Sequence, residues 1–149
     1  MSILAIKEKG RNRRIRKTIL VYLIISLLAV AIDNIYAVFG HGVSSAAMTW
    51  MFLYPLLGGT LFYLLIELLL PGICQFTGYR VFYNVYNSGI AVLTTGSFLK
   101  GILDIAGTNS PYVVLFSVAG WLFIASGLIL LTILAVNQKR RKQSAKPLG

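Results

Sequence analysis

Hydrophobic residues run through this chain in four long stretches, and polar residues gather between the stretches and at both ends. The stretches cover residues 18–39, 47–70, 89–107 and 112–137. Each is long enough, at about 1.5 Å of rise per helical residue, to cross a hydrocarbon layer about 30 Å thick. The pattern predicts an all-α integral membrane protein. Its four transmembrane helices are expected to form an up-down-up-down bundle over residues 18–137.

Glycine and proline interrupt the apolar pattern at a few places. Pro111 follows the short polar sequence TNS and is well suited to begin the last helix. Inside the second stretch, Pro55 removes a backbone donor, and Gly58 and Gly59 follow it closely. We therefore expect a kink in the second helix, which neighbouring helices in a membrane can accommodate.

The segment at about 73–88 differs from the four apolar stretches because it is aromatic and weakly polar. Its aromatic residues recur at helical spacing: Tyr79, Phe82, Tyr83 and Tyr86. This spacing predicts an amphipathic helix lying in the membrane interface, with a long inner loop as the alternative. The rings are interpreted as an interfacial belt and not as a substrate cage.

Composition supports the membrane assignment. Of the 149 residues, 57% are hydrophobic and only 12% are charged, whereas soluble domains have about a quarter of their residues charged. The net charge of +10 could indicate nucleic-acid binding. Almost all basic residues, however, lie in the tails at 1–17 and 138–149, which predicts that both termini are cytoplasmic. The tails are expected to contact anionic lipid headgroups, and no nucleic-acid partner is expected.

The first stretch allows a second interpretation, because a basic cluster followed by an apolar run also begins a signal peptide. Its apolar character continues past Asp33 to Phe39, which favours a retained span. Small bacterial proteins with four spans share this length and charge layout. We therefore expect an integral protein of a bacterial cytoplasmic membrane with both ends inside.

Four polar residues near the outer ends of the spans form the candidate site. Ionisable groups inside a bilayer are costly and need a partner or water. Lys100 and Asp104 are one helical turn apart and can pair with each other. Asp33 and His41 are expected at a similar depth. The cluster is compatible with a cation or proton site, a polar ligand pocket or a polar lock between helices.

Two further groups of residues are expected to have structural roles. Glu67 and Arg80 form a candidate polar pair near the inner face. Small residues on the third and fourth stretches are candidates for close helix packing, with a narrow water-accessible groove as the alternative. They are Gly89, Gly96, Gly101, Gly107, Ser117, Gly120 and Gly127. The hydroxyls of Thr94, Thr95 and Ser97 are expected to bond carbonyls one turn earlier in their own helix.

The sequence offers little catalytic chemistry. One cysteine and one histidine are too few for an intrachain disulfide or a Cys/His metal site, and no cofactor is expected. The leading hypothesis is a non-enzymatic subunit or accessory that associates with other membrane proteins or its own copies through small-residue faces. One alternative is a minimal oligomeric transporter or channel that uses the intramembrane Asp/Lys cluster. Another is a membrane enzyme acting on lipid or quinone, which would require His41 close to Asp33 or Asp104.

Overall fold

The computed structural model describes residues 3–39, 44–70, 73–75 and 78–144, and this part of the chain contains helices and turns but no strand. Four helical segments in it are long and apolar enough to cross a membrane. They are Ile15–Phe39, Ala46–Leu69, Tyr79–Ile105 and Val113–Arg140. The prediction of an all-helical chain with four potential membrane spans is confirmed.

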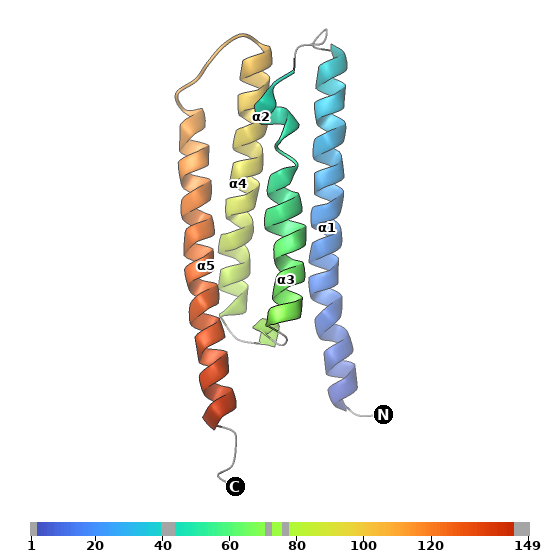
Figure 1. Ribbon diagram of the computed structural model, residues 1–149, viewed down its shortest axis with the longest axis vertical. Coiled ribbons are helices and arrows are strands. Elements are labelled where there is room, and N and C mark those ends of the chain that lie inside the picture. The colour runs from blue at the N-terminus through green and yellow to red at the C-terminus, as the bar shows by residue number, and fades with distance from the viewer. Residues whose placement is uncertain (1–2, 40–43, 71–72, 76–77, 145–149) are drawn as a thin grey trace.

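Three of the spans lie in long continuous helices, α1 (Ile3–Phe39), α4 (Tyr79–Ile105) and α5 (Val113–Ser144). Successive spans run in opposite directions, so the beginning of α1 and the end of α5 lie at the same end of the molecule (Figure 1). The helix α1 already begins in the basic tail, because no proline interrupts its sequence before the apolar residues start.

The second span is built from pieces instead of one regular helix. It consists of the short helix α2 (Ala46–Thr49), the π-helix η1 (Tyr54–Leu61) and the helix α3 (Phe62–Leu69). Pro55 is buried in the first turn of η1. Proline cannot donate a helical hydrogen bond and its ring crowds the preceding turn, so the regular helical bonding is lost there. In place of a simple kink, the second span is divided into a short α-helix, a π-helix and a second α-helix.

The four spans are arranged as an open row. The helix α1 packs mainly on η1 and α3, η1 also packs on α4, and α5 packs almost wholly on α4 (Figure 1). Among the described residues, no extensive contact joins α1 to α5. A closed four-helix bundle would bring the first and last helices together, so the observed packing differs from the expected bundle.

The expected interfacial helix at 73–88 is not a separate element. The described part of this segment comprises a single 3₁₀ turn, η2 (Ile73–Gln75), and the first turns of α4, which belong to the third span. Phe82 and Tyr86 are only 0% and 4% exposed. Their rings pack on Phe62 of α3, whose ring centroid lies 4.2 Å from that of Tyr86. The aromatic residues therefore form core and not a surface belt.

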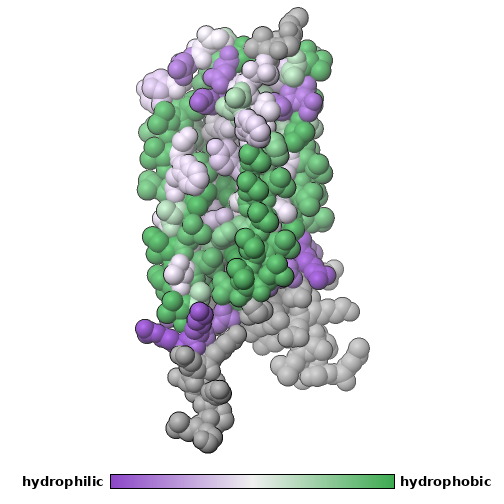
Figure 2. Space-filling view, in the orientation of Figure 1, coloured by the Kyte–Doolittle hydropathy of each residue, from purple (hydrophilic) through white to green (hydrophobic). Residues whose placement is uncertain are grey.

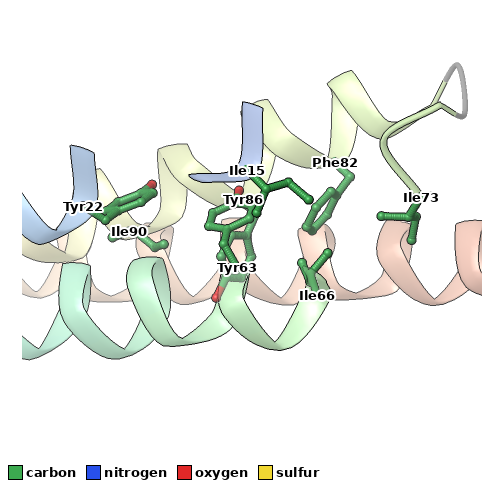
Figure 3. Close-up of a cluster of buried hydrophobic side chains, with 8 residues drawn as sticks. All are labelled: Ile15, Tyr22, Tyr63, Ile66, Ile73, Phe82, Tyr86 and Ile90. Atoms are coloured by element: carbon green, nitrogen blue, oxygen red, sulfur yellow. The ribbon is translucent and has the colours of Figure 1, made fainter. Parts of the chain in front are cut away.

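The main core lies toward the end of the molecule that carries the termini. It contains side chains from α1, α3, η2 and α4, which Figure 3 shows converging between the helices. They are Ile15, Tyr22, Tyr63, Ile66, Ile73, Phe82, Tyr86 and Ile90. A smaller cluster of Ala29, Met48 and Met51 lies toward the other end. On the face drawn in Figure 2 the middle of the molecule is mostly green and hydrophobic, with purple polar residues near both ends, as expected of a membrane protein.

Helix α4 ends at a glycine with left-handed backbone. Gly107 has φ of +66°, and the amide of Thr108 donates to the carbonyl of Leu103 at 3.0 Å. The amide of Gly107 also donates to the carbonyl of Asp104 at 3.2 Å. This pair of bonds is the Schellman arrangement, which satisfies the last carbonyls of a helix. A Cβ added to Gly107 would have nothing within 4 Å, so this glycine makes no close contact with another helix. Its role is to end α4 through its left-handed backbone.

Candidate functional site

Two of the polar residues predicted near the outer ends of the spans, Asp33 and Asp104, lie beside the short helix α2. The hydroxyl of Ser45 donates to Oδ2 of Asp104 at 2.6 Å, and that of Thr49 donates to Oδ1 of Asp33 at 3.3 Å. Ser97 donates to the carbonyl of Ala47 at 2.6 Å instead of bonding its own helix. The helix α2 therefore ties α1 to α4. We call Asp33, Ser45, Thr49, Ser97 and Asp104 the polar seam.

Lys100 does not join this seam. It is exposed, and Arg16 with Glu67 is the one salt bridge between described residues. The expected Lys100–Asp104 pair is therefore not formed, and the carboxylate of Asp104 accepts a hydrogen bond from the hydroxyl of Ser45 instead. His41 lies outside the described residues. Asp33 and Asp104 are thus linked through α2, and a charge cluster with Lys100 is not assembled.

The seam makes a clear prediction for two substitutions on α4. Lys100→Gln should change the free energy of unfolding by less than about 0.5 kcal/mol, because no ion pair is lost. Asp104→Leu should cost about 1 kcal/mol, because the Ser45 hydroxyl loses its acceptor. Denaturant titration of the purified protein in detergent measures both. Equal losses in the two variants would contradict the separation of Lys100 from the seam.

The inner-face pair is also different from the one expected. Glu67 lies 3.8 Å from Nε of Arg16, measured at its Oε1, and not against Arg80. The Arg16 side chain is 74% exposed, so solvent screens this ion pair and it contributes little to stability. Arg80, on the second residue of α4, is left exposed toward the space between α4 and α1.

Four of the small residues predicted for helix packing lie in the contact between α4 and α5: Gly89, Gly96, Gly120 and Gly127. A Cβ added to Gly96 would lie 2.5 Å from Cβ of Phe116, and one added to Gly120 would lie 2.6 Å from Cδ2 of Leu93. These distances are far below van der Waals contact. The close approach of the two helices therefore depends on residues without side chains.

The other three small residues behave differently. Gly101 faces α2, where an added Cβ would lie 2.6 Å from Cβ of Met48. Gly107 ends α4, as described above, and Ser117 is exposed on α5. The spacing of small residues therefore predicted the α4–α5 contact surface only in part, since two of the seven positions serve no helix contact.

The site that sequence reasoning missed is a tyrosine–asparagine cluster inside the row of helices. The hydroxyls of Tyr22 (α1) and Tyr63 (α3) both donate to Oδ1 of Asn87 (α4), each at 2.7 Å. The two rings stack with centroids 6.0 Å apart, and their packing within the core is visible in Figure 3. One amide oxygen thus connects three helices. An asparagine within an apolar span was a usable signal, but it fell in the segment expected to be interfacial.

A groove runs beside this cluster between α1 and α4. It consists of two adjoining cavities of about 590 and 480 Å³ that share Lys17, Thr18 and Tyr83. On α4 its lining extends from Arg80 to Thr95, a length of about 22 Å at helical rise. We call these two cavities together the α1–α4 groove. Asn87 and Tyr22 also line it, so the hydrogen-bonded cluster forms part of its wall.

The polar and apolar lining of the groove is arranged along its length. Lys17 lines both cavities, and Arg80, the second residue of α4, lines the smaller one. Farther along, the wall is largely apolar, with Val21 52% exposed and Ile25 38% exposed. Among the described residues, no group of three His, Cys, Asp or Glu side chains could hold a metal ion. The groove can therefore offer positive charge at one end and hydrocarbon contact along the rest.

Comparison of the chain with protein-family models, with curated proteins and with solved structures finds no match.

Proposed function

We propose that this protein is a non-enzymatic subunit or accessory of the cytoplasmic membrane of a bacterium, associating with other membrane proteins or with its own copies. The observation that carries the proposal is the open row of helices. Because α5 packs almost wholly on α4, most of its circumference is left without a protein neighbour in the chain. Only 11% of the most apolar stretch of α5 is buried inside the molecule.

The packing of the helices changes which surfaces are proposed to mediate association. The glycines of α4 and α5 are used within the chain, so they do not supply an outer association face. The outer faces of α1 and α5 remain, at the two ends of the row (Figure 1). In a membrane such faces contact either lipid or another helix, and close-fitting helix contacts add van der Waals stabilisation that lipid does not match.

We further propose that the row is oriented with both termini in the cytoplasm. The termini lie at one end of the molecule (Figure 1), and twelve of the basic residues belong to the two tails. Lysine and arginine flanking membrane helices favour the cytoplasmic side. The polar seam around α2 would then lie toward the outer surface.

Transport through the outer polar residues is less well supported by the geometry. Such a mechanism needs Asp33, Lys100 and Asp104 to act on one ion or proton. Both carboxylates instead accept hydroxyl hydrogen bonds from α2, and Lys100 is not within ion-pair distance of either. This arrangement favours a structural role for the seam.

Photo-crosslinking in the cells that make the protein tests the proposal. A photoreactive amino acid is placed singly at Leu122 or Ile129, which are 63% and 62% exposed on one face of α5. We expect a defined protein adduct from at least one of these positions. An adduct of twice the 16.4 kDa chain mass would identify self-association, and any other mass would identify a different partner.

Matched positions on the opposite end of the row serve for comparison. Leu20 and Leu27 are 59% and 63% exposed on α1 and share the same seven-residue spacing. Adducts at these positions would assign the association to α1 instead of α5. If none of the four positions yields a protein adduct, both outer faces contact lipid alone and the proposal is wrong.

A further inference from the structure

We propose that the α1–α4 groove binds one anionic phospholipid, with the headgroup at Lys17 and Arg80 and an acyl chain along the apolar wall. This inference concerns the space between α1 and α4 and does not depend on the association proposed above. It rests on the charge, the length and the hydrogen-bonding groups of the groove.

The charge of the groove has a single sign. Lys17 and Arg80 both line the smaller cavity of the groove, one from α1 and one from α4, and both are exposed. None of the described residues that line the two cavities is acidic. Glu67, a nearby acid, is paired with Arg16. Two cations that face one cavity without an ion-pair partner among the described residues favour an anionic group, and basic pockets between membrane helices bind phosphate headgroups in this way.

The length of the groove suits a lipid better than a free anion. Its α4 wall spans about 22 Å from Arg80 to Thr95, whereas one leaflet of hydrocarbon is about 15 Å thick. Val21, Ile25 and Ile90 provide the apolar lining beyond the cations. A headgroup held by the cations would therefore place an acyl chain directly against this wall. A small soluble anion would leave the apolar part uncovered.

One hydrogen-bonding group in the wall also matches a phospholipid. Asn87 accepts both tyrosine hydroxyls through Oδ1, and its amide NH₂ has no acceptor among the described residues. Asn87 lies about 10 Å beyond Arg80 along α4 and lines the groove. A lipid presents ester carbonyls between its headgroup and its chains. The NH₂ group of Asn87 is placed to donate to one of them.

Native mass spectrometry of the full-length protein, titrated in detergent with phosphatidylglycerol or phosphatidylcholine, tests the proposal. The wild type should retain phosphatidylglycerol preferentially. Lys17→Gln combined with Arg80→Gln should weaken that binding about 30-fold, or roughly fivefold for each lost charge. Lys139→Gln with Arg140→Gln removes the same charge from exposed positions of α5 outside the groove, and should leave the binding unchanged.

A second pair of variants tests the acyl-chain part without changing charge. Ala91→Phe places a ring at an exposed position in the groove lining and should lower phosphatidylglycerol binding several-fold. Ala125→Phe, at an exposed position on α5, is the control and should have no effect. Equal losses in the two charge variants would show general attraction to the basic surface. That result, or undiminished binding in Ala91→Phe, would overturn the proposal.

Discussion

Replacing Gly59 with alanine is expected to separate α1 from η1 and to lower the free energy of unfolding by about 3 kcal/mol. An added Cβ would lie 2.2 Å from Cγ and 2.3 Å from Cδ1 of Tyr22. It would also lie 2.8 Å from Cβ of Tyr22, so rotating the ring does not remove the clash. The ring is further held by its bond to Asn87 and its stacking on Tyr63.

The neighbouring glycine provides a matched control. A Cβ on Gly58 would lie 3.4 Å from Cγ1 of Ile90, which is ordinary contact, so Gly58→Ala should cost less than about 1 kcal/mol. Denaturant titration in detergent measures both variants. Adding Gly59→Ala to a Tyr22→Ala protein should cost less than in the wild type, since the clashing ring is gone and only the contact with Cβ of residue 22 remains. Equal costs for Gly58→Ala and Gly59→Ala would contradict this account.

Asn87→Leu is expected to destabilise the protein by about 2–3 kcal/mol. The substitution keeps the approximate size of the side chain but leaves the hydroxyls of Tyr22 and Tyr63 without their shared acceptor. A buried polar group that loses its partner costs about 1–3 kcal/mol, and interhelical hydrogen bonds in membranes fall at the lower end of that scale. The same denaturant titration measures the loss.

Two comparisons separate this hydrogen-bond effect from a general effect of leucine. Asn84→Leu changes an exposed asparagine one turn earlier on α4 and should cost less than about 0.5 kcal/mol. In a Tyr22→Phe and Tyr63→Phe background no hydroxyl remains to be orphaned, so Asn87→Leu should be nearly neutral there. A full loss in that background would show that Asn87 stabilises the protein by other means.

The membrane spans were predictable because burial in lipid requires long apolar segments, and composition alone reveals these. The beginning of the third span was not. Tyrosine and asparagine lower the hydropathy of residues 79–88, yet the ring of Tyr86 packs inside the core and the amide oxygen of Asn87 accepts hydrogen bonds from two hydroxyls. Hydropathy is assigned to each residue type separately. It takes no account of the hydrogen-bond and packing partners that lower the free-energy cost of burying a polar residue.

The candidate site shows a similar limit. The spacing of Lys100 and Asp104 allowed an ion pair, but the partner of Asp104 is Ser45, which is distant in sequence. Ser45 reaches it because it caps the separate short helix α2, and the second span is interrupted between α2 and η1. Helical periodicity assumes a continuous helix. The sequence pattern could therefore indicate that Asp33 and Asp104 need partners. It could not predict that the hydroxyls of Thr49 and Ser45 are those partners.

The glycine contact between α4 and α5 bears on how the chain is made as well as on how it is held. These helices are adjacent in sequence, joined by a short turn after Gly107, and share the most extensive interface in the molecule. Contacts between sequence neighbours form quickly because little chain entropy is lost in closing the loop. The last two spans can therefore form early as one helical hairpin, which packs through α4 onto the second span.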